Sequence, residues 1–221
     1  MNIDLLRYAD DLSAELLNEG ISFNEYGFPI FPEEIILKEI PEDIGFCPMT
    51  QRLQIRNIEK QILCHFENDR RIFQHIADLK KIADEGRNYY GVAGLDLSPR
   101  TGSDPDYQNL IILVNQMATL RIGLYGCRII PNFRIGSIKT INALKSYPEN
   151  IPFASGVLGC FYGDINYNIA YMKTKIMFAK PQSLIIYGQL RKEYRMVLDE
   201  IGIEYRVVED FQRRSRRGRK N

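Results

Sequence analysis

The chain lacks the marks of several protein classes. Its 221 residues include only four cysteines, and no two of them form a C-x-x-C pair, which argues against disulfides and a structural zinc site. No apolar run approaches the roughly 18 residues of a membrane-spanning helix. The first residues contain no basic segment followed by an apolar one, so we expect no signal peptide and a cytoplasmic protein.

Common catalytic and nucleotide-binding motifs are also missing. The two histidines, His65 and His75, do not have the H-E-x-x-H spacing of a zinc-dependent hydrolase. The glycine-rich segment 156–163 matches neither the dinucleotide fingerprint nor the P-loop. No serine or cysteine lies in a nucleophile-elbow sequence. The sequence therefore gives no support to covalent catalysis and names no reaction.

Acidic residues are absent from the last ten positions, which carry six of the 29 basic residues. Without those six, 23 basic residues face 28 acidic ones, so an acidic body precedes a basic tail. Such a body is not expected to coat nucleic acid by itself. The basic residues of the tail are Arg213, Arg214, Arg216, Arg217, Arg219 and Lys220.

Strand and helix patterns alternate from about residue 61 onward. Short apolar runs at 61–66, 89–97, 127–131, 152–158, 183–187 and 205–208 predict six strands, separated by helices at about 68–84, 107–124, 138–145, 167–179 and 190–201. This alternation predicts an α/β fold with a mainly parallel sheet. We favour an open doubly wound sheet, with a partial barrel of the TIM type as the alternative, because eight βα units are not evident.

The domain organisation follows from these patterns. Residues 1–60 are expected to form an N-terminal helix and an irregular arm packed on the core, because prolines interrupt the pattern after residue 28. Residues 61–211 form the α/β domain. Residues 212–221 contain no apolar side chain, so we expect a disordered tail.

The most polar loop follows the predicted strand 89–97. Ligands of parallel α/β proteins bind beyond the carboxyl ends of the strands, so we expect a site at this rim. Asp96 is its centre, because a carboxylate that ends an apolar strand must be paired, coordinated or used. Equally, it could cap its own turn. We predict Asn132, Arg134 and Tyr187 as neighbours with catalytic roles.

Other rim residues suggest a small anionic ligand, phosphate-containing or nucleotide-like. Ser98 and Arg100 lie on the loop after Asp96, and Gly156 and Gly159 lie where a strand gives way to a helix. Backbone amides at such a turn can bind phosphate, although turn geometry is the simpler explanation for the glycines.

A divalent cation is the weaker possibility. Asp96, Asp104 and Asp106 would offer the oxygen ligands that Mg²⁺ or Mn²⁺ prefers. The two later acids also suit the start of the next helix, which is the simpler account. A metal would imply metal-assisted chemistry on a phosphate-containing substrate.

Several short motifs resemble an uncharacterised family of phage, plasmid and bacterial proteins, domain of unknown function forty-four seventeen. They span roughly residues 25–190: Tyr26-Gly-Phe-Pro, Asp96-Leu-Ser98, Asn115 with Arg121, Tyr125-Gly126, Ile129-Ile-Pro131, Gly156 to Gly159 and Ile185-Ile-Tyr-Gly188. Residues 132–134, Asn-Phe-Arg, depart from the pattern. The resemblance implies an α/β fold and a mobile-element setting, and it implies no activity.

Two functional classes remain open. One is a protein with a rim site for a small anionic ligand and a tail for non-specific nucleic-acid contact. The other is a non-catalytic interaction module whose basic tail only aids solubility. The six positive charges of the tail could bind the phosphates of any nucleic acid without reading its sequence. Membrane contact is less favoured, because no acyl signal or amphipathic helix accompanies the tail.

Overall fold

The computed structural model describes residues 3–156 and 163–210. The strands are β1 (Gly45–Pro48), β2 (Gln61–Cys64), β3 (Gly91–Ala93), β4 (Ile129–Ile130), β5 (Pro152–Gly156), β6 (Ser183–Tyr187) and β7 (Glu204–Val208). The α-helices are α1 (Leu5–Asn18), α2 (Asp69–His75), α3 (Leu79–Gly86), α4 (Pro105–Leu124), α5 (Ile165–Ala179) and α6 (Lys192–Ile201). Four 3-10 helices are also described: η1 (Glu33–Ile35), η2 (Met49–Gln54), η3 (Ile58–Lys60) and η4 (Ile138–Ser146).

Polar side chains fix where the longer helices begin. Asp104 accepts a hydrogen bond from the amide of Asp106, and Pro105 opens α4 where its missing N–H is no loss. Asp164 likewise accepts from the amide of Tyr167 at 2.7 Å to start α5. Gly202 ends α6 with φ of 75°, a conformation that glycine adopts without strain.

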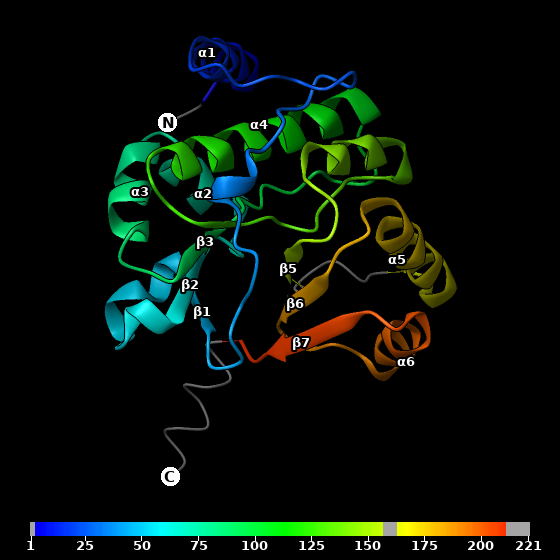
Figure 1. Cartoon of the computed structure of the whole chain (residues 1–221). Coiled ribbons are helices and arrows are strands. Elements are labelled where there is room, and N and C mark those ends of the chain that lie inside the picture. Colours follow the sequence, from blue (N-terminus) through cyan, green and yellow to red (C-terminus); the bar gives the residue numbers. More distant parts are fainter. Residues whose placement is uncertain (1–2, 157–162, 211–221) are drawn as a thin grey trace.

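The strands form two parallel sheets, β1-β2-β3-β4 and β5-β6-β7 (Figure 1). A parallel bridge between Asn132 and Ala154 joins them just beyond β4. There the amide of Phe133 donates to the carbonyl of Ala154, and the amide of Ala154 donates to that of Pro131, at 2.7 and 2.8 Å. The strands therefore follow one another in chain order across both sheets.

This array curls around an apolar interior. One cluster of buried side chains draws on every strand from β1 to β6: Phe46, Ile62, Cys64, Ala93, Ile130, Ala154, Ile185 and Tyr187. The rings of Phe46 in β1 and Tyr187 in β6 lie 5.7 Å apart, so distant strands meet inside the curl. Arg206 of β7 donates to the carbonyls of Pro41 and Glu42, a few residues before β1.

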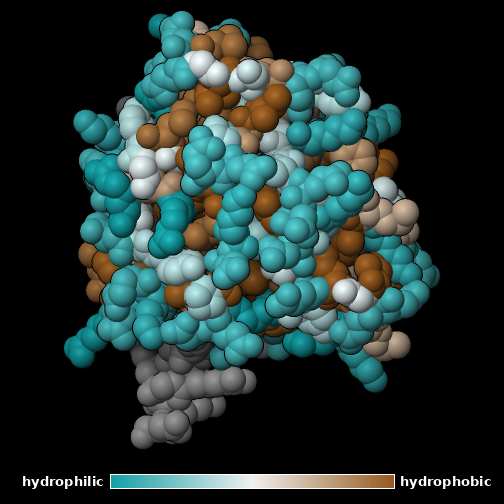
Figure 2. Space-filling model, in the orientation of Figure 1, coloured by the Kyte–Doolittle hydropathy of each residue, from teal (hydrophilic) through white to brown (hydrophobic). Residues whose placement is uncertain are grey.

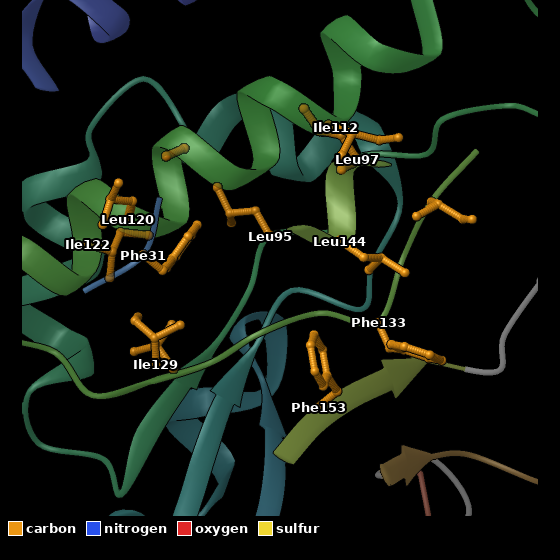
Figure 3. Close-up of a cluster of buried hydrophobic side chains, with 14 of the residues drawn as sticks. Phe31, Leu95, Leu97, Ile112, Leu120, Ile122, Ile129, Phe133, Leu144 and Phe153 are labelled. Carbon is orange, nitrogen blue, oxygen red and sulfur yellow. The ribbon is translucent and has the colours of Figure 1, made fainter. Parts of the chain in front are cut away.

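A second, larger cluster lies between the strands and the helices. Figure 3 shows part of it, with Leu95 and Leu97 beneath α4 and Ile112 beside Leu97. Helix α1 packs across α4, and Arg121 of α4 forms ion pairs with Glu15 and Glu19. Hydrophilic side chains cover most of the face in Figure 2, with apolar surface visible among them. None of the helices in residues 3–156 and 163–210 has the length and apolar character needed to cross a bilayer.

The α/β class and the parallel strands are confirmed, and two details of the prediction change. The order of the strands lacks the reversal of a doubly wound sheet, so the curled array fits the barrel alternative. The strands divide into sheets of four and three rather than about six in one. Strand β1 lies in the segment expected to be an irregular arm, because Phe46 and Cys47 are buried beside β2.

The helix expected at 68–84 is two helices. Asp78 interrupts it, because its carboxylate accepts from the amide of Lys81 at 3.0 Å and caps a new helix, α3. The helix expected at 138–145 is the 3-10 helix η4, in which the Thr140 hydroxyl donates to the carbonyl of Ser137 at 2.8 Å.

The joint between the sheets leads to a first prediction. A Cβ at Gly94 would lie 2.9 Å from the amide nitrogen of Asn132 and 3.2 Å from its Cβ. Gly94→Val should therefore destabilise the protein by about 1–3 kcal/mol, the usual range for overpacking. Gly102→Ala is the matched control, since a Cβ there has no neighbour within 4 Å. Equal urea midpoints for the two variants would contradict the close contact.

Candidate functional site at the strand ends

The segment after β3 is held by helix α4. The side chain of Asn115 accepts from the amide of Leu97 at 3.0 Å and donates to its carbonyl at 2.9 Å. The hydroxyl of Thr119 accepts from the amide of Leu95 at 2.9 Å. These side chains supply the hydrogen bonds that a neighbouring strand would otherwise make, so the segment stays extended. Leu95 and Leu97 then face the core, and Asp96 faces the opposite side.

Asp96 meets two side chains that follow β4. The amide of Asn132 donates to its carboxylate at 2.8 Å, and the guanidinium of Arg134 lies 3.2 and 3.3 Å from its two oxygens. Asp96 and Asn132 are each 7% exposed. The structure thus brings together three residues that the sequence predicted as neighbours, from two segments 36 to 38 positions apart.

The environment of Asp96 shifts its ionisation in competing directions. Burial raises the pKa of the carboxyl above its ordinary value, and the nearby Asp69 adds to this. Arg134, Asn132 and Lys175 act in the opposite direction, but burial is the largest effect. Asp96 therefore holds its proton more readily than an exposed aspartate does.

A buried lysine completes the cationic side of this group. The ammonium of Lys175, in α5, donates to the carbonyl of Phe133 at 2.6 Å and lies 4.1 Å from the centre of the Phe133 ring. It is 8% exposed. Since Phe133 lies between Asn132 and Arg134, Lys175 belongs to the same corner of the molecule. We define the rim site as Asp96, Asn132, Arg134 and Lys175.

Helix α2 contacts the loop beside this site. Asp69 accepts hydrogen bonds from the amide and the hydroxyl of Ser98, at 3.1 and 2.9 Å. Ser98, which the sequence predicted to bind a ligand, is thus hydrogen-bonded to Asp69 of α2. Arg100 is exposed on the same loop.

The three acids proposed as metal ligands do not form a site together. Asp104 caps α4, Asp106 is exposed in its first turn, and Asp96 is bound by Asn132 and Arg134. Within the described ranges, no group of three or more His, Cys, Asp or Glu residues is arranged to hold a metal ion. The helix start was the correct interpretation of Asp104 and Asp106.

The remaining predicted residues are Tyr187, Gly156 and Gly159, together with the basic tail. Tyr187 is buried and packs its ring against Phe46 and Phe66, with centroids 5.7 and 5.6 Å apart. Gly156 ends β5 where a Cβ would lie 2.9 Å from the Phe66 ring, so packing accounts for this glycine. Gly159 and the basic tail residues are outside the residues that the structure describes.

A small cavity lies between α4 and the two segments that carry the rim site. It has room for little more than a water molecule. Its lining is Gly94, Leu95, Ile112, Asn115, Gln116, Thr119, Asn132, Arg134 and Tyr147.

Lys175 and Asn115 were not assigned to the site from the sequence. Lys175 did carry a signal, because it lies three residues after Met172 and four before Ala179, on the buried face of α5. A lysine on an apolar stripe needs a partner. Asn115 and Thr119 likewise interrupt the buried surface of α4, one turn apart.

Comparisons with protein-family models, curated proteins and solved structures found no match to this chain.

The raised pKa of Asp96 generates a second prediction. A group whose folded pKa lies above its unfolded value stabilises the fold at low pH and loses that contribution as pH rises through the folded pKa. Asp96→Asn keeps the shape and cannot ionise. Relative to wild type, Asp96→Asn should therefore have a larger free energy of unfolding at pH 7 than it has, relative to wild type, at pH 4. Urea denaturation at both pH values measures it, and a shift toward the wild type would contradict the account.

Proposed function

We propose that the rim site binds a small phosphate-containing or nucleotide-like ligand. The observation that supports this most is the pairing of two cations, Arg134 and Lys175, around one buried carboxylate at the carboxyl ends of parallel strands. Arginine binds phosphate oxygens with paired N–H donors, and lysine adds a point charge. The ligand would present its phosphate to the part of the Arg134 side chain that solvent reaches, since this side chain is 22% exposed.

Asp96 gives this site a proton-transfer group, should the ligand react. Burial raises the pKa of its carboxyl, and Asn132 fixes one of its oxygens at 2.8 Å. A buried carboxyl whose pKa lies above its ordinary value is a candidate for proton transfer. We propose this role for Asp96, with Asn132 as the positioning residue.

The alternative is a non-catalytic interaction module whose rim is a polar loop. In that case Asp96, Arg134 and Lys175 stabilise the fold and bind nothing. The two proposals differ in one measurement, the effect of Arg134 on ligand affinity.

For the tail, we propose non-specific contact with RNA or DNA. Its support is compositional, since six basic residues stand within ten positions without an acid. Strand β7 ends at Val208, so the tail begins a few residues after a strand end on the same edge as Asp96. The mobile-element setting implied by the sequence resemblance stays part of this proposal.

Ligand binding tests the rim site directly. Inorganic phosphate, diphosphate and nucleoside monophosphates are titrated by calorimetry into wild type, Arg134→Met and Arg134→Lys. Arg134→Met should lose roughly ten- to hundredfold in affinity, as expected for hydrogen bonds to a charged group, and Arg134→Lys should recover part of it. Arg7→Met, on the exposed face of α1, is the control. No binding by folded wild type, or equal affinity in all variants, favours the interaction module.

Deletion of residues 212–221 tests the tail. Full-length protein should bind duplex DNA of unrelated sequences equally, with a slope of log affinity against log salt near −5 for about six phosphate contacts. The truncated protein should lose this binding and keep its urea midpoint. Fluorescence anisotropy at several salt concentrations measures both slopes. Undiminished binding after truncation would place the contact on the body.

A further inference from the structure

His65, the residue after β2, has a completely buried side chain. Its exposed fraction is 0%, and neither ring nitrogen has a hydrogen-bond partner among the residues that the structure describes. The ring of His75, in the last turn of α2, meets it edge to face with centroids 5.8 Å apart. One nitrogen of His75 and one oxygen of Glu67 are also buried and have no partner in the described part of the chain. Buried polar atoms are rarely left this way without a reason.

Within residues 3–156 and 163–210, the charged groups around the two rings do not offer His65 a counter-ion. Glu67 beside β2 and Glu85 of α3 favour a proton on His75, whereas Arg52 of η2 and Arg71 of α2 oppose it. Arg52 and Glu85 are themselves paired at 2.8 Å. The charged neighbour that acts on His65 is His75. A proton on both rings would therefore place two like charges in contact.

Helix α2 connects this pair to the rim site. At its start, Asp69 binds the amide and hydroxyl of Ser98, two residues after Asp96. At its end, the carbonyl of Ile76 accepts from the hydroxyl of Tyr8 in α1 at 2.9 Å. Between these ties, Ile72 is the buried residue of a helix seven residues long. A helix this short depends on its contacts rather than on its own hydrogen bonds.

We propose that α2 is a proton-operated cover of the rim. When the His65–His75 pair takes up protons, α2 separates from β2, and Asp69 releases the loop at Ser98. At neutral pH both rings are neutral and α2 is closed. Acid thus frees the loop beside Asp96 without unfolding the sheet.

The sign of the effect follows from burial. Desolvation, and then His75, lowers the pKa of His65 from its ordinary 6.5 to about 3 in the closed protein. Burial lowers the pKa of His75 as well. With α2 open, His65 returns to its ordinary value. The open fraction should therefore rise by up to about tenfold for each pH unit below about 6.5 from His65 alone, and His75 adds to this.

Hydrogen exchange followed by mass spectrometry tests the proposal on the full chain. Protection factors, corrected for the intrinsic pH dependence of exchange, are measured at pH 7, 6 and 5. Those of α2 and of residues 97–99 should fall together by at least tenfold from pH 7 to 5, while those of α4 and β6 stay constant. The readout does not involve a ligand, so it is independent of the proposed binding function.

Substitutions at the two histidines provide the controls. His65→Phe and His65→Leu place an apolar side chain at the buried position. Since neither side chain can take up a proton, either variant should abolish most of the acid-induced loss of protection in α2. His75→Gln should weaken the response and leave the part due to His65. The proposal is overturned if α2 protection is independent of pH, if all regions lose protection together, or if a folded His65→Phe or His65→Leu protein keeps the full response.

Discussion

The backbone beyond β3 has to be paired in a dry interior, and α4 provides the pairing. The side chain of Asn115 accepts from the N–H of Leu97 and donates to its C=O, as a neighbouring strand would. The hydroxyl of Thr119 accepts from the N–H of Leu95. Unpaired peptide groups here would cost about 1–3 kcal/mol each. With these bonds, the segment stays extended, Leu95 and Leu97 fill the core, and Asp96 turns to the strand ends. The position of the carboxylate is thus a consequence of backbone pairing.

A carboxylate held there must be matched in charge. Asn132 and Arg134 follow β4, and Lys175 reaches the carbonyl between them from α5. Three elements therefore supply one corner, and the bridge from Asn132 to Ala154 fixes that corner to the second sheet. The same contacts that stabilise the buried carboxylate bring Arg134 and Lys175 to one corner. Any ligand bound there, as proposed, would therefore use contacts that also stabilise the fold.

Much of this arrangement was predictable from local patterns. The apolar run that ends in Asp96 and the alternation of strands and helices predicted the edge and placed Asn132 and Arg134 beside the acid. The curl of the sheet was not predictable, because it depends on Phe46 and Tyr187 meeting across the interior from strands far apart in the chain. Strand β1 was missed since prolines frame it, and Lys175 was missed because its partner is a backbone carbonyl, which no side-chain motif marks.

The most direct test of the central claim is a carbon-13 NMR titration of the Asp96 carboxyl, with and without inorganic phosphate, diphosphate and a nucleoside monophosphate. The structure predicts a pKa above the ordinary aspartate value in the free protein. An anion bound at Arg134 and Lys175 would draw on the charges that stabilise the carboxylate, so saturation with a binding anion should raise the pKa further. An ordinary pKa, or a raised pKa that none of these anions moves, would contradict a ligand site centred on Asp96.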